Sequence, residues 1–139
     1  MTPAYASQIV TDARVARFVG ERIGAIIYPP FTCMGIERDG EIVAGAVFNC
    51  FTGHDVEITV AGRGWTRAFF RAVGQYAFEQ LKCGRVQVTT EDEKIARLAE
   101  RLGGQREGLL RDKFGPGKDG IVLGVLKREY KFNENAQSP

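Results

Sequence analysis

The chain has 139 residues, with 19 Lys and Arg against 17 Asp and Glu and a formal net charge of +2 at pH 7. This length suits a single domain, predicted at residues 1–139 with a flexible tail at 130–139. A hydrophobic share of 44% and a charged share of 26% are typical of a globular protein and exclude a disordered or fibrous chain. The small net charge gives no general reason to expect nucleic acid or an anionic membrane as a partner.

The cysteines and the lengths of the apolar runs predict the cellular compartment of the protein. Cys33, Cys50 and Cys83 lie far apart in the sequence, which fits neither a disulfide framework nor a zinc site. No apolar run is long enough to span a bilayer, and the first residues lack the basic start and apolar core of a secretory signal. We therefore expect a cytoplasmic protein with reduced thiols, no membrane contact and no bound metal.

The first third of the chain predicts one helix and a hairpin. Apolar residues recur at helical spacing over 12–23, which predicts an amphipathic helix. Strands are predicted at 32–38 and 41–50, joined by Asp39-Gly40, a dipeptide typical of tight hairpin turns. Both faces of the second strand are apolar, so it belongs inside a sheet rather than at its edge.

The remaining elements alternate. A strand at 54–61 leads into a long helix at 66–82, whose Gly74 indicates close packing at that point because glycine weakens a helix. Then follow a strand at 85–90, a helix at 92–102 and two closing strands at 105–113 and 120–127. Hairpin-linked strands favour antiparallel pairing and strand–helix–strand units favour parallel pairing, so the sequence predicts an α/β mixed sheet with helices on both faces.

The loop between the strand at 54–61 and the long helix is the strongest candidate for a binding site. Free N–H groups and the dipole at a helix N-terminus attract an anion, and Arg63, Arg67 and Arg71 add positive charge. A tight turn with surface arginines explains the same residues equally well, because a Gly-x-Gly pattern is common. The loop matches neither a P-loop nor the complete dinucleotide-binding fingerprint.

A polar row on the preceding strand is the second candidate. Asp55, Glu57 and Thr59 alternate with apolar residues and so share one face. A carboxylate that faces a cleft can accept a proton from an amine, whereas one on an open face only contacts water. Asp55 is better explained as a residue that contacts water. Glu57 fits either role. His54 is the only histidine and has no serine near it, which argues against a Ser-His-Asp site. Trp65 either walls a ligand groove or anchors the loop.

Three passages of the sequence share their order and spacing with a known superfamily. They are the strand–loop–helix passage at 58–67, the strand at 85–90, and the run at 98–104 followed by Glu-Gly-Leu-Leu-Arg at 107–111. In this order they resemble the GNAT superfamily of acyl-CoA-dependent N-acyltransferases, and the Trp-Thr-Arg opening of the long helix is similar to that of small phage members. The resemblance covers about residues 32 to 127 and implies a mostly antiparallel sheet.

The resemblance also implies a co-substrate, acetyl-CoA, bound where the strands at 54–61 and 85–90 separate. Backbone groups of Val60 and Ala61 would pair with the pantetheine arm, and the amides of 62–67 would hold the pyrophosphate. An amine acceptor, either a small molecule or a peptide, would then attack the thioester directly, with Glu57 accepting its proton. The residues expected to bind acetyl-CoA are Ile58, Thr59, Val60, Ala61, Gly62, Arg63, Gly64, Trp65, Thr66, Arg67 and Asp92.

The sequence departs from the family pattern in the loop after residue 61, which lacks the usual Gln/Arg-x-x-Gly-x-Gly/Ala form, and at three single positions. Ala99 stands where many members have a tyrosine that protonates the leaving thiolate, Asp92 where many have Asn, and Gly104 where Phe is usual. Asp92 matters most, because a carboxylate cannot donate the hydrogen bonds of an amide. These changes keep a second function open, a catalytically silent module that binds CoA or a protein partner.

Two further expectations concern the acceptor and a possible homodimer. The acceptor pocket is expected between the first helix, the 24–31 segment and the 114–119 loop. A dimer is expected to pair through the last strand, Ile121 to Leu126. Nucleic-acid binding through the arginine-rich helix start is the weakest alternative, because of the small net charge.

Overall fold

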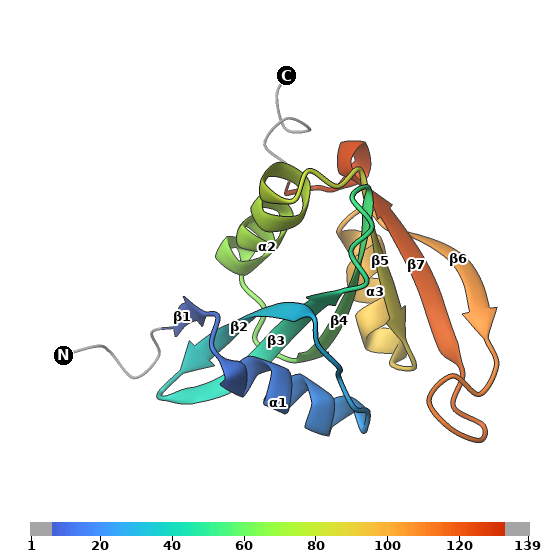
Figure 1. Ribbon diagram of the computed structural model, residues 1–139, viewed down its shortest axis with the longest axis horizontal. Coiled ribbons are helices and arrows are strands. Elements are labelled where there is room, and N and C mark those ends of the chain that lie inside the picture. Colours follow the sequence, from blue (N-terminus) through green and yellow to red (C-terminus); the bar gives the residue numbers. More distant parts are fainter. Residues whose placement is uncertain (1–6, 133–139) are drawn as a thin grey trace.

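The computed structural model describes residues 7–132, which form one seven-stranded sheet covered by helices (Figure 1). The spatial order of the strands is β1-β2-β3-β4-β5-β7-β6, and only the β4–β5 pair is parallel. This confirms the predicted mixed, mostly antiparallel sheet, with the second strand of the hairpin in its interior. The strands are β1 Ser7–Val10, β2 Phe31–Arg38, β3 Glu41–Asn49, β4 Asp55–Gly62, β5 Arg85–Thr90, β6 Gln105–Leu110 and β7 Gly120–Leu126.

Helices cover both faces of the sheet. α1 (Ala13–Ile23) lies on one face, and α2 (Arg67–Gly74) and α3 (Glu93–Arg101) lie on the other (Figure 1). α1 approaches β3 closely, because a Cβ atom at Gly45 would lie 2.8 Å from a methyl group of Val15. Two separate apolar layers result, one under α1 and a larger one under α2 and α3.

The predicted long helix changes character halfway. It begins as α2 and continues from Gln75 to Gln80 as a π-helical segment. Gly74 stands at the junction, where a Cβ atom would lie 2.6 Å from the ring of Tyr130. The expected close packing at Gly74 is confirmed, and its partner is the chain after β7.

The chain beyond β7 packs on the core for longer than expected. After a 3₁₀ turn at Lys127–Glu129, Tyr130 is 4% exposed and donates a hydrogen bond of 2.6 Å to the carbonyl oxygen of Phe70. Phe132 packs on Phe70, with ring centroids 5.7 Å apart. The predicted tail therefore does not include residues 130–132, and its remainder, 133–139, lies outside the described residues.

Two details of the sheet differ from prediction. β1 was not expected; it pairs with β2 as an antiparallel edge strand. β7 lies between β5 and β6 and is hydrogen-bonded on both sides. The expectation that a dimer pairs through Ile121–Leu126 is therefore wrong, because that strand has no open edge.

Candidate functional site

The site is built on the one place where two neighbouring strands of the sheet separate. β4 and β5 pair over four residues each, from Asp55 with Arg85 to Ile58 with Val88. Beyond that point β4 pairs only with β3, and β5 only with β7. Both strands thus carry one unpaired backbone edge, and the two edges face each other across a fork.

A cleft of about 260 Å³ occupies this fork. Its walls come from the end of β4, the end of β5, the start of α3, the end of α1 and the β6–β7 connection. The lining residues are Arg22, Ile23, Thr59, Val60, Ala61, Gly62, Thr89, Thr90, Glu91, Asp92, Ile95 and Phe114. Four of the residues expected to bind the co-substrate, Thr59 to Gly62, and also Asp92, therefore meet in one cleft.

Trp65 does not close this cleft. Its ring packs against those of Phe69 and Phe70, with centroids 5.5 and 6.0 Å away. It lines a separate apolar cavity on the α2 side of the sheet. Of the two roles considered for Trp65, the structure shows packing of the loop against α2.

The loop from Gly62 to Arg67 presents fewer free amides than expected. Gly62 has φ +110°, a conformation that glycine adopts readily, and the N–H of Arg63 donates 3.0 Å to the carbonyl oxygen of Val43. The expectation that all amides of 62–67 face a ligand is therefore wrong for Arg63. Thr66 caps α2, its Oγ1 accepting from the N–H of Phe69 at 3.1 Å.

The start of α2 still offers donors for an anion. In the part of the chain that the structure describes, the first-turn amides of Arg67 and Ala68 have no hydrogen-bond acceptor. These groups lie at the positive end of the helix dipole. They are consistent with the anion site that the sequence predicts.

An arginine that sequence reasoning missed joins this loop. A Cβ atom at Gly64 would lie 2.7 Å from Nη1 of Arg38, so the end of β2 brings a guanidinium group against the loop. Among residues 7–132, Arg38, Arg63 and Arg67 form no ion pair and no side-chain hydrogen bond. Arg71 instead lies over the ring of Phe132, 5.7 Å from its centroid.

Glu57 lies at the base of the fork. Its Oε1 accepts a hydrogen bond of 3.1 Å from Oγ1 of Thr89, across the β4–β5 pair. Strand alternation places Glu57 on the same face as Ala61, which packs with α1. The carboxylate is partly buried and has a second oxygen that is not bonded to the protein in the described chain.

Asp55 is further from the fork and has a structural partner. Nη1 of Arg85 donates 2.8 Å to Asp55 Oδ1, and Nη2 donates 2.5 Å to Glu107 Oε1. Burial alone would lower the pKa of Arg85, but the hydrogen bonds to Glu107 and Asp55 outweigh it and raise the pKa. Asp55 is thus held in an ion-pair network.

Asp92 has a local role. Its Oδ1 accepts 2.8 Å from the N–H of Lys94, so it caps α3, and its own N–H donates 3.0 Å to Oγ1 of Thr90. The carboxylate is exposed and borders the cleft. Its negative charge interacts favourably with the helix dipole at the N-terminus of α3 and so stabilises the helix.

The other residues singled out lie away from the fork. His54 is exposed at the opposite end of β4, with its ring against Gly84. Cys83 is 1% exposed, and burial raises the pKa of its thiol. Residues 7–132 contain no group of three or more metal-ligating side chains, and none of their helices is both long and apolar enough to cross a bilayer.

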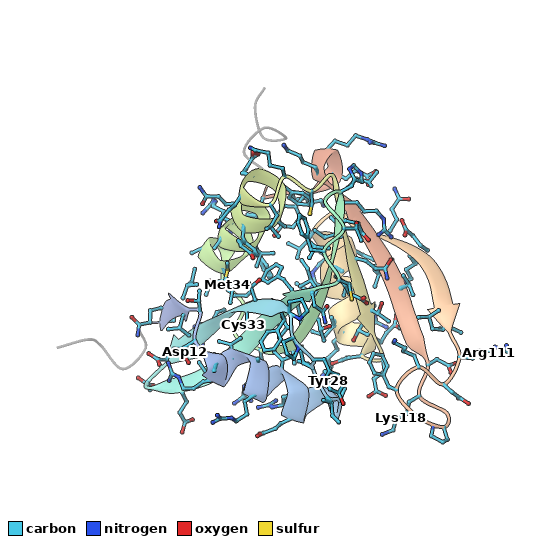
Figure 2. The ribbon with its side chains drawn as sticks, in the orientation of Figure 1. Asp12, Tyr28, Cys33, Met34, Arg111 and Lys118 are labelled. Carbon is cyan, nitrogen blue, oxygen red and sulfur yellow. The ribbon has the colours of Figure 1, made fainter. Side chains whose placement is uncertain are left out.

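Two of the three elements expected around an acceptor reach the cleft. Arg22 and Ile23 come from α1 and Phe114 from the β6–β7 connection, whereas residues 26–31 line other hollows beyond α1. Figure 2 shows Tyr28, just after α1, and Lys118, on the β6–β7 connection, at the same end of the molecule. The 24–31 segment therefore does not contribute to the wall of this cleft.

The sheet order, the fork between its parallel strands and the flanking helices define the GNAT N-acyltransferase fold. No protein-family model matches the sequence, and a search of curated proteins finds no significant match. The resemblance inferred from the sequence is nevertheless confirmed at the level of the fold by solved structures of acetyltransferases.

Three of these structures illustrate the likeness. A mutant of the spermidine N-acetyltransferase SpeG from Vibrio cholerae superposes with a TM-score of 0.70 at 14% identity, over 94% of this chain and 98% of that one. SpeG in complex with CoA and spermine gives 0.68 at 13% identity, over 89% and 97%. A probable acetyltransferase gives 0.62 at 26% identity, over 72% and 63%.

Proposed function

We propose that this protein is an N-acyltransferase that moves an acyl group, acetyl in the simplest case, from a CoA thioester to a primary amine. The observation that carries the proposal is the fork: β4 and β5 stop pairing after Ile58 and Val88, and a cleft opens between their unpaired edges. An extended ligand can add to such an edge by backbone hydrogen bonds. One of the structures sharing this fold holds CoA and spermine.

The donor is proposed to run from the loop to the base of the fork. Its diphosphate would bind the free amides at the start of α2 together with Arg38, Arg63 and Arg67, since guanidinium groups match phosphate oxygens. Its pantetheine arm would pair with the backbone of Val60 and Ala61. The thioester carbonyl would then lie near Ile58–Val60, where a backbone N–H stabilises the negative charge that develops on oxygen.

Glu57 is proposed as the base. The amine attacks the thioester carbon, the carbon–sulfur bond breaks, and the proton lost by the amine passes to Glu57 directly or through one water. The free coenzyme thiol, with an ordinary pKa of about 8.5, can leave without a protein acid at neutral pH. The buried Ala99 is therefore compatible with turnover.

The acceptor is proposed to be a small molecule or peptide with a primary amine that enters from the α1 side, where Glu57 lies. Its pocket would include Arg22, Ile23 and Phe114. Two of the structures with the same fold are of a spermidine N-acetyltransferase, and one of them holds spermine, so spermidine is the first acceptor to test.

Calorimetric titration of the full chain with acetyl-CoA tests the donor site. We expect saturable binding, and no heat of binding at millimolar ligand would overturn the proposal. Labelled acetyl-CoA with a panel of amines, spermidine included, then identifies an acceptor. With that acceptor, Glu57→Gln should lower turnover about 10²- to 10⁴-fold and leave the acetyl-CoA affinity unchanged.

One observation favours a second function, a CoA-binding module without catalysis. The carboxylate of Asp92 is engaged with the backbone of α3 and has no proton to donate to a ligand. Binding of acetyl-CoA without any acceptor in the panel would favour the silent module. Turnover that Glu57→Gln leaves unchanged would instead remove Glu57 as the base.

A further inference from the structure

An apolar cavity lies beside the fork, on the face of the sheet that carries α2 and α3. Its volume is about 60 Å³, and all its lining side chains are aliphatic or aromatic. Tyr130 is among them, but its hydroxyl group is hydrogen-bonded to Phe70. A hollow lined in this way stays dry, because a water inside it would have no hydrogen-bond partners.

This cavity and the cleft share walls. Val60 of β4 and Ile95 of α3 line both. Ile58 and Val88, the last paired residues before the strands separate, also line the cavity. The cavity therefore starts at the base of the fork, where the proposed function puts the thioester.

The two faces of the sheet offer different chemistry at this point. Glu57 and Thr89 lie on the α1 face, where the amine is proposed to enter. Ile58 and Val60 alternate with Glu57 and face α2 and α3. A group attached to the thioester carbonyl and turned away from the amine would point into the cavity.

We propose that this cavity receives the acyl chain of the donor, so that the protein prefers short acyl-CoA thioesters of about three to five carbons over acetyl-CoA. The proposal rests on the proposed function and names its donor more closely. A volume of roughly 10–15 Å³ accommodates one water-sized group, so 60 Å³ accommodates about four non-hydrogen atoms. A methyl group alone leaves most of this space empty.

Binding of an acyl-CoA series to the full chain tests this. Because each buried methylene group increases affinity about fourfold, butyryl-CoA should bind about fifteenfold more tightly than acetyl-CoA by calorimetry. Octanoyl-CoA, whose chain exceeds the cavity, should gain nothing beyond butyryl-CoA. Equal affinities for acetyl-CoA and butyryl-CoA would overturn the inference, whereas failure of CoA itself to bind would overturn the proposed function.

Variants that fill the cavity supply the control. Ala99→Leu places extra carbons in it from α3, and Val73→Phe does so from α2. Each should abolish the preference for butyryl-CoA and leave the affinity for free CoA unchanged. Ala13→Leu, on the exposed start of α1, should keep the preference. If a cavity-filling variant that folds, as judged by its circular dichroism, still prefers butyryl-CoA by the same factor, the inference is wrong.

Discussion

Thr89, the first residue of β5 beyond its pairing with β4, donates a hydrogen bond of 3.1 Å to Glu57 on the neighbouring strand. This bond fixes one carboxylate oxygen, and the other has no hydrogen-bond donor in the described part of the chain. The same threonine lines the cleft and is 6% exposed. It is therefore a positioning residue for the proposed base.

The first prediction follows from this contact. Thr89→Val keeps the shape of the side chain and removes the donor, so Glu57 loses its orientation. With a confirmed acceptor we expect kcat to fall about tenfold, less than in Glu57→Gln, with no change in the dissociation constant for acetyl-CoA. Thr89→Ser should restore most of the turnover, since it restores the hydroxyl group. Equal loss in the serine and valine variants would contradict the role.

The second prediction concerns Arg38. If its guanidinium group binds the donor's phosphates, Arg38→Gln should weaken CoA binding about two- to fivefold, the range of exposed ion pairs. High salt should reduce the difference from the wild type, because screening weakens exposed charge pairs. Arg17→Gln is a matched control, because Arg17 is exposed on α1 and lies outside the loop. Calorimetry at low and high salt provides both measurements, and an unchanged affinity in Arg38→Gln would exclude a phosphate contact.

The third prediction compares two loop glycines. A Cβ atom at Gly62 would overlap the carbonyl oxygen of Val43, and its φ of +110° is unfavourable for alanine. At Gly64, with φ +78°, the atom in the way is the end of the flexible Arg38 side chain. Gly64→Ala should cost about 1–2 kcal/mol of stability, the penalty of a left-handed backbone, and Gly62→Ala distinctly more. Urea denaturation measures both, and equal costs would argue against the clash with Val43.

The fourth prediction reverses a rule of helix propensity. Alanine in place of glycine inside a helix ordinarily stabilises by about 1 kcal/mol. Gly74→Ala should instead destabilise, because its Cβ atom would lie 2.6 Å from the ring of Tyr130. Combining it with Tyr130→Ala tests the cause: in that background the alanine at position 74 should become neutral or stabilising. A higher urea midpoint for the single variant would show that Tyr130 moves aside freely.

The fifth prediction concerns acid stability at the start of α1. Hydrogen bonds from the side chain and then the backbone of Arg14 lower the pKa of Asp12 from 3.8 to about 2. The folded state therefore binds this proton more weakly than the unfolded chain, so the stabilisation is complete above about pH 4 and is lost as the pH falls through about 2. The urea midpoints of the wild type and Asp12→Asn should differ at neutral pH and converge near pH 2. A gap that stays constant down to that pH would contradict the linkage.

Most of the fold follows from local sequence patterns. Strong local signals predict three parts of the fold, and the structure confirms them: α1, the Asp39-Gly40 hairpin, and the strand–loop–helix passage from β4 to α2. β1 has none, since its four residues are largely exposed and their pairing with β2 defines them. The place of β7 inside the sheet, with β6 at its edge, has a signal in the sequence. β6 begins Gln-Arg-Glu and is exposed throughout, whereas β7 is apolar on both faces.

The candidate site depends more on tertiary register. The positions of Glu57 and Thr59 on one face follow from strand alternation alone. Arg38 could not be assigned, because it lies 25 residues before Arg63 at the end of a different strand, and only the pairing of β2, β3 and β4 brings it to the loop. The engagement of the Arg63 amide with Val43 likewise depends on how far the β3–β4 ladder extends.

Beyond Ile58 and Val88, the facing edges of β4 and β5 carry backbone donors and acceptors that no other strand of the described chain pairs. Main-chain donors and acceptors are the same for every amino acid, so an incoming molecule that adds to them needs no particular side chain at those positions. The proposed binding mode would therefore place little demand on side chains, in keeping with a fold shared among sequences only 13–15% identical. Backbone hydrogen bonds of this proposed kind would be kept even where the side chains along the two strands differ.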